Sequence, residues 1–262
     1  MVERWLLQFH PDKCRVMTIG RKADEASYSM GTGSGRQILT TTSSEKDLGV
    51  TFENTLSFKG HINAQVKTGN QLVGLVRRSF DYLDVPMMRK VFTGVVRPRL
   101  EYGSAIWDPV TKTEKIQLEN VQRRATKLVN GLQNHSYGER LRILKLPSLE
   151  YRRVRGRMIE TYKILHGHYD MEFPWFVLES QRTAESQVTT RGHSMKLFKV
   201  RYNNPLKRKA FSHAVVEDWN SLTEDIVHAP SINAFKNRLD RFWAQRQYQY
   251  TEYGYWDGYA DK

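Results

Sequence analysis

The chain has 262 residues, of which 39% are hydrophobic, with 6 Trp, 11 Phe and 13 Tyr, so it can build a core, and wholesale disorder is excluded. Its 41 Lys and Arg residues outnumber 28 Asp and Glu residues. The resulting net charge of +13 favours a polyanionic partner, with nucleic acid first and an acidic membrane surface second.

Cysteine usage and hydropathy indicate a soluble intracellular protein. The single cysteine, Cys14, excludes an intramolecular disulfide framework. Residues 1–14 carry early charges and no sustained apolar run, so they do not predict a signal peptide. No run of about 18 apolar residues predicts a membrane span.

Residues 1–60 predict a short β layer. Residues 14–19, 38–42 and 48–52 have strand-like composition, and the polar stretch 21–37 predicts a loop. Its glycines resemble a phosphate-cradling loop, but Arg36-Gln37 replaces the Lys-Ser/Thr pair of a P-loop, which favours a flexible hairpin loop.

From His61 the apolar period becomes helical. Helices are predicted over 62–78, over 91–102 with a disturbance at Pro98, over 118–132, over 137–146, over 151–165 and over 211–222. Ser231 is the expected N-cap of a last helix. Residues 167–205 predict a long, partly irregular connection.

Basic residues are concentrated between Val121 and Lys163, where eleven Lys and Arg oppose three Glu. Helical spacing places cations of two helices opposite the apolar faces, where they are candidates for contact with a phosphate backbone. The candidates are Arg123, Arg124 and Lys127 on one helix and Arg152, Arg153 and Arg157 on the other. Salt bridges and solvation within the fold are the alternative.

Ordered blocks along the chain carry a family resemblance. The blocks are VVRPRLEYGSAIWDP (95–109), LENVQRRATKLVNGL (118–132), SYGERLRILKLPSLEYRRVRGRMIETYKIL (136–165), TRGHSMKL (190–197), FSHAVVEDWNSL (211–222) and SINAFKNRLDRFW (231–243). Together they resemble the region that follows the active site in non-LTR (LINE-type, jockey/CR1-like) retrotransposon reverse transcriptases. The resemblance covers roughly residues 5–243.

The resemblance implies an α+β, predominantly α fold. Residues 1–60 would be a remnant of the palm, 61–135 a helical thumb-like region, 136–246 a helical C-terminal region, and 247–262 a disordered aromatic and polar tail. EKDLGVTFE (45–53) resembles the hairpin that supports the primer end. WLLQFHPDKCRVMTIG (5–20) resembles the segment just past the catalytic carboxylates, although His10 stands where the family more often has Asn.

The same resemblance implies an RNA-directed DNA polymerase whose N-terminal polymerase portion lies outside this chain. This chain would bind RNA or RNA–DNA duplex in the nucleus or in a cytoplasmic ribonucleoprotein, with no membrane partner. Mg²⁺ would be needed only by the complete enzyme, and no catalytic residue, metal site or cofactor is assigned to this chain. An independent or domesticated nucleic-acid-binding module is the alternative.

Other candidate sites have simpler explanations. Tyr259-Ala260-Asp261 matches part of the polymerase Asp-Asp turn, but it has no second Asp and no following strand, which favours coincidence. His166-Gly167-His168 and the His10/Cys14 pair lack the further ligands of a metal site. Trp107 and Trp219 are candidates for base stacking, but the apolar helical patterns beside them favour core packing.

Overall fold

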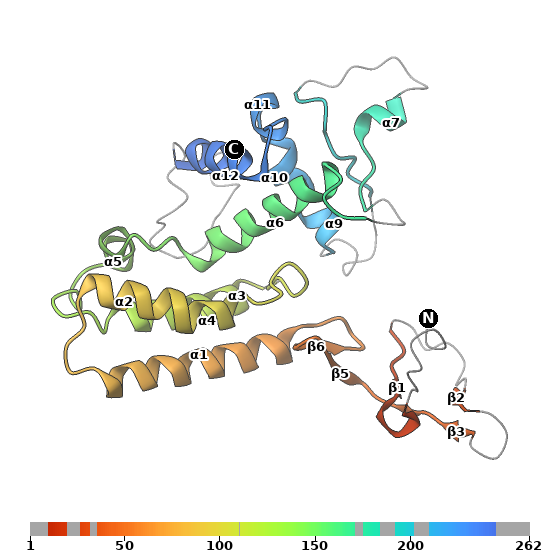
Figure 1. Cartoon of the computed structure of the whole chain (residues 1–262), viewed down its shortest axis with the longest axis horizontal. Coiled ribbons are helices and arrows are strands. Elements are labelled where there is room, and N and C mark those ends of the chain that lie inside the picture. Colours follow the sequence, from red (N-terminus) through yellow and green to blue (C-terminus); the bar gives the residue numbers. More distant parts are fainter. Residues whose placement is uncertain are drawn as a thin grey trace. The chain divides into compact units, whose positions relative to one another are not determined.

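A computed structural model describes residues 10–19, 27–31, 36–109, 111–170, 175–183, 192–201 and 210–244. The chain divides into two compact units, Met1–Ala64 and Gln65–Lys262 (Figure 1). The predicted disorder of residues 247–262 and the Tyr-Ala-Asp match fall outside the described residues. The α+β, predominantly α class is confirmed, since the strands are short and helices dominate the second unit.

The first unit carries the short strands. After the turn of 3₁₀ helix Pro11–Lys13, β1 (Arg15–Val16) pairs in parallel with β4 (Thr40–Thr41), and β2 (Ser29–Met30) pairs antiparallel with β3 (Gln37–Ile38). The hairpin β5 (Ser44–Asp47) and β6 (Val50–Glu53) completes it. In the described part of the chain every named strand lies before residue 60, as the change of period at His61 predicts.

The β5–β6 hairpin closes with a two-residue turn. Leu48 and Gly49 have positive φ angles of 44° and 86°, which suits the right-handed twist of two paired strands. The register pairs Asp47 with Val50 and Glu45 with Phe52. The expected hairpin at 45–53 is therefore present. α1 (Lys59–Ser79) follows and crosses the division between the two units.

The helical segment from Val85 to Glu101 contains a π-helical turn just before Pro98. α2 (Val85–Val91) leads into a π-helical turn, η4 (Phe92–Val96), and then into α3 (Arg97–Glu101). Pro98 has no N–H to donate within the helix, and the wider turn absorbs this defect, with Arg97 N donating to Phe92 O. The predicted disturbance at Pro98 is confirmed as a π turn rather than a break.

α4 (Lys112–Thr126) begins with a capping box formed by Thr111 and Glu114. The prediction that this helix continues to Leu132 is wrong, because it ends at Thr126. Beyond that point the chain bonds to a distant loop. Asn130 N donates to Leu83 O at 3.0 Å, and Leu83 N donates to Asn130 Oδ1 at 3.1 Å.

Two N-capped helices follow α4. α5 (Tyr137–Leu144) ends at Lys145 in the left-handed conformation, with φ 52°. α6 (Leu149–Leu165) begins at Ser148, whose hydroxyl accepts from Tyr151 N. α6 contacts α4, α10 and α12 and lies between the α2–α5 helices and the C-terminal helices (Figure 1).

The C-terminal helices are α7 (Glu179–Thr183), α9 (Phe211–Ala214), α10 (Val216–Asn220), α11 (Glu224–Val227) and α12 (Ile232–Ala244). The predicted helix over 211–222 is two short helices that meet at Val215. Ser231 caps α12 as predicted, accepting from Ala234 N at 3.2 Å. Trp219, Phe235 and Leu239 pack with α6 residues in one buried cluster.

Candidate nucleic-acid interface

The loop between α3 and α4 is anchored by a buried tryptophan. Trp107 is fully buried, and its indole Nε1 donates to Tyr102 O at 2.6 Å. Trp219 is also fully buried, with its Nε1 donating to Met195 O at 2.8 Å. Core packing of both tryptophans is therefore confirmed, and neither ring is available to stack on a base.

Two of the candidate arginines on α6 lie in the interior. The prediction that Arg153 and Arg157 point away from the packed side of the helix is wrong: they are only 3% and 8% exposed. Arg157 Nη1 donates to Asp108 Oδ2, and Arg153 Nη2 donates to Glu150 Oε2 at 2.7 Å. Asp108 follows the anchored Trp107, so the α3–α4 loop covers this side of α6.

The concentrated positive charge is partly balanced by carboxylates from other parts of the chain. Arg155 forms a two-bonded pair with Asp240 of α12, at 2.5 and 2.7 Å. Arg152 forms a similar pair with Glu101 of α3, where Nη2 to Oε2 is 2.8 Å. These acids lie outside 121–163, which explains why the count of charges in that stretch overstates the free positive charge.

One group of cations remains in excess of its carboxylates. Arg97 and Arg152 both pair with Glu101, and the charge of Arg89 acts on Arg97; Glu101 is the one acid bonded to this group among the described residues. Partial burial, followed by the charges of Arg152 and Arg89, lowers the pKa of Arg97, although Glu101 opposes this. Like charges held this close are stabilised by an anion, and we call these three residues the arginine cluster.

The cations predicted on α4 have different surroundings. Arg123 is half-buried, with its guanidinium 4.5 Å from the centroid of the Tyr137 ring. Arg124 is exposed and donates to Asn70 Oδ1 at 3.0 Å. Lys127 is the exposed C-cap residue. Arg124 and Lys127 therefore keep the exposure that phosphate contact requires, whereas Arg123 mainly packs on Tyr137.

A buried acid, Glu119, and a half-buried acid, Asp218, lie beside α6. Burial raises the pKa of Glu119 to about 7, against hydrogen bonds from Tyr137 and Leu149. Burial also raises the pKa of Asp218 to about 7, although Arg157 lies 4.0 Å away and favours the charged form. Both sites lie in packed surroundings, so the raised pKa values are consequences of burial rather than signs of catalysis.

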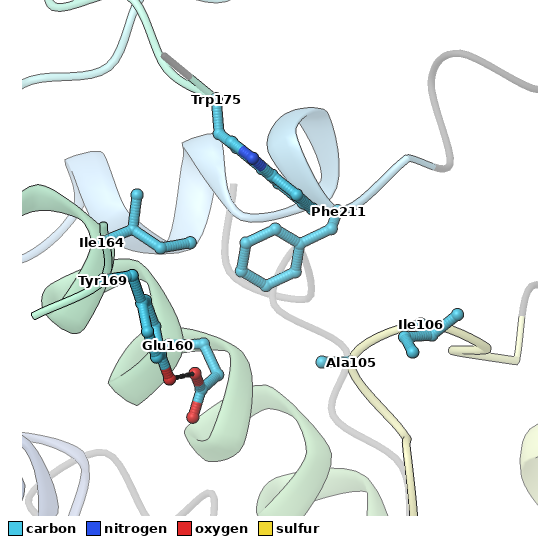
Figure 2. A pocket seen from close by; sticks show the side chains of 7 residues that line it. All are labelled: Ala105, Ile106, Glu160, Ile164, Tyr169, Trp175 and Phe211. Atoms are coloured by element: carbon cyan, nitrogen blue, oxygen red, sulfur yellow. Dashed lines mark hydrogen bonds between the residues drawn. The ribbon is translucent and has the colours of Figure 1, made fainter. Parts of the chain in front are cut away.

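An apolar pocket of about 510 Å³ opens beside the C-terminal half of α6 (Figure 2). Its walls include Ile106, Ile164, Trp175 and Phe211. Glu160 supplies the carboxylate of the pocket, and Figure 2 shows it bonded to the hydroxyl of Tyr169, at 2.5 Å. Nothing in the sequence pattern marked this pocket, because its walls come from four separate segments.

In the part of the chain that the structure describes, the remaining polar clusters do not assemble a catalytic or metal site. Ser194 Oγ lies 2.7 Å from His228 Nε2, but Glu224 contacts the same nitrogen, at 3.1 Å, so the histidine is not oriented as in a catalytic triad. His166 stacks on Tyr162 at 3.9 Å. The described residues contain no group of three or more His, Cys, Asp or Glu side chains that could hold a metal ion.

Comparisons with known protein families, with curated proteins and with solved structures each find no match. Among the helices that the structure describes, none is long and apolar enough to cross a membrane.

Proposed function

We propose that this chain binds the phosphate backbone of RNA or RNA–DNA duplex, as the C-terminal portion of a non-LTR reverse transcriptase. The observation that carries the binding proposal is the arginine cluster, in which Arg97 and Arg152 share the single carboxylate of Glu101 and Arg89 adds a third positive charge beside Arg97. Guanidinium groups in excess of their carboxylates suit phosphate oxygens, which they bind with paired hydrogen bonds. The family assignment is supported by the ordered sequence blocks.

The exposed cations Arg124 and Lys127 form a second group of phosphate ligands in the proposal. They lie on the same compact unit as the cluster. Arg153 and Arg157 are left out, because their burial and carboxylate partners assign them to the interior. Phosphate contacts of this kind are independent of sequence and weaken steeply with salt.

The test is the salt dependence of binding to a labelled RNA–DNA duplex. Replacing Arg89, Arg97 and Arg152 by Gln should reduce the slope of log K against log salt by about 2 to 3 in magnitude, at roughly 0.7 to 0.9 per lost contact. Gln keeps helix-forming character, so the fold should survive. Unchanged affinity and slope would refute the cluster as a phosphate site.

A charge-matched control separates local contact from net charge. Replacing Lys199, Lys236 and Arg241 by Gln removes the same formal charge from the C-terminal part of the unit. If duplex binding reflects only the overall charge, both triple variants will lower the slope equally. A local site predicts a large change for the cluster variant alone.

A further inference from the structure

The apolar pocket opens on the same stripe of α6 as the arginine cluster. Arg152, Gly156 and Glu160 are spaced by four residues, so they follow one another along one side of the helix. Gly156 leaves this stripe open between them, since a Cβ added there would meet nothing within 4 Å. At 1.5 Å per residue, the pocket lies about 12 Å from the cluster along the helix.

Among the described residues, the walls of the pocket include exposed aromatic and aliphatic side chains. Trp175 is 55% exposed, Ile106 is 56% exposed and Tyr169 is 42% exposed. Trp175 packs edge-on against Phe211, with centroids 6.1 Å apart. A flat aromatic group is the natural occupant of such walls, because it contacts ring faces without requiring many polar partners.

One polar group in the wall of the pocket is the carboxylate of Glu160, which accepts hydrogen bonds. Glu160 Oε1 accepts from Lys163 Nζ at 2.8 Å, and Oε2 accepts from Tyr169 at 2.5 Å. A carboxylate offers about four acceptor positions, so these two bonds hold it in place and leave capacity for a donor on a ligand. An exocyclic amino group is such a donor, and cytosine N4 is a known partner of Glu and Asp.

We propose that this pocket takes an unpaired, amino-bearing base of a single-stranded nucleic acid, whose backbone continues to the arginine cluster. The proposal rests on the proposed function for its choice of occupant, because the neighbouring excess of positive charge favours a polyanion over an apolar peptide. Trp175 and Ile106 contact the faces of the base, and Glu160 accepts from its amino group.

Oligocytidylate and oligouridylate provide a matched pair of probes for the full chain. The two bases have nearly the same size, but cytosine presents an amino donor where uracil presents an oxygen. Fluorescence anisotropy should show oligocytidylate binding roughly tenfold more tightly, the effect of one hydrogen bond to a charged group. Glu160→Gln should remove or reverse this preference, because the Gln amide can donate to the oxygen that uracil presents in place of the amino group.

Loss of the pocket wall tests the stacking contact. Trp175→Ala should weaken oligocytidylate binding by about 5- to 150-fold, since stacking on an aromatic side chain contributes about that much per base. The salt slope should stay unchanged, because no phosphate contact is lost. Ile106→Gln should act in the same direction, and Tyr82→Ala, at another exposed aromatic residue, is the matched control.

The outcomes separate the two proposals. If Trp175→Ala and Ile106→Gln bind oligocytidylate as the wild type does, the pocket proposal is overturned, while duplex binding through the arginine cluster can still hold. If the chain fails to bind duplex but binds oligocytidylate in a Trp175-dependent way, the pocket stands and the duplex proposal fails. Equal affinity for the two oligonucleotides overturns the pocket proposal as stated. Binding of a peptide partner that competes for Trp175 without any oligonucleotide binding also overturns it.

Discussion

Replacing Glu119 by Gln should change how the stability of the chain depends on pH. Glu119 is 1% exposed in α4, and its carboxylate accepts from Tyr137 at 2.5 Å and from Leu149 N at 3.0 Å. The effect of burial on the pKa exceeds the opposite effect of these hydrogen bonds, and the pKa rises to about 7 from its usual 4.5. Gln has nearly the same shape and can keep an acceptor towards both donors, but it cannot ionise.

The direction of this pH dependence follows from the difference in proton binding between the folded and unfolded chains. Between pH 4.5 and about 7 the folded chain holds a proton on Glu119 that the unfolded chain has released, so raising the pH costs stability. The contribution is fully present below pH 4.5 and is lost as the pH rises through about 7. At about 1.4 kcal/mol per pKa unit, the loss is about 3 kcal/mol as an upper estimate.

Urea denaturation of wild type and Glu119→Gln at several pH values measures this loss. Other groups titrate in the same range, but they contribute to both proteins and cancel in the difference. The variant should gain about 3 kcal/mol relative to wild type between pH 4.5 and about 8. Glu45→Gln, on the exposed strand β5, serves as the control. Parallel pH profiles for wild type and Glu119→Gln would refute the reasoning.

Two further predictions concern stability, one at a buried ion pair and one at a tightly packed glycine. Asp108→Asn should lower the free energy of unfolding by about 3 kcal/mol, because it leaves the buried charge of Arg157 with only the carboxylate of Asp218, 4.0 Å away. A loss of under about 1 kcal/mol would mean that the Asp108–Arg157 pair behaves like a surface salt bridge. Gly69→Ala should destabilise the chain by about 1 to 3 kcal/mol, because its Cβ would lie 2.9 Å from Leu100 Cδ2. Gly74→Ala, on the same helix, should stabilise it by about 0.5 to 1 kcal/mol, since its Cβ would make only ordinary contacts. Thermal unfolding compares the two glycine variants, and an effect of the same sign in both would contradict this account.

Local sequence pattern predicts the elements well and their ends less well. The Ser231 cap depends on residues close in sequence and lies where the pattern places it. Leu48 and Gly49, predicted as the start of a strand over 48–52, instead form the turn of the hairpin that the family resemblance implies. The end of α4 depends on the bonds between Asn130 and Leu83, which are 47 residues apart. The spacing of apolar residues does not reveal hydrogen bonds between residues so far apart, so the predicted helix extends beyond its observed end.

The same limit applies to the basic residues. Helical spacing places Arg153 and Arg157 on one stripe of α6, but whether that stripe faces solvent depends on Asp108 and Asp218. Those carboxylates are far away in sequence. Arg97 lies within the block VVRPRLEYGSAIWDP, 55 residues before Arg152, and only the fold shows that the two side chains lie close together.

The α3–α4 loop fixes the positions of the two proposed sites relative to each other. Glu101 at its start bonds to Arg152, and Ile106 near its middle lines the pocket. Asp108 near its end bonds to the interior side of α6, two residues after the pocket wall. Buried Trp107 holds this loop in the core, and the loop carries both Glu101, which bonds to the arginine cluster, and the pocket wall. A single strand that occupied both sites would therefore meet a phosphate site and a base site whose spacing is set by one helix and one anchored loop.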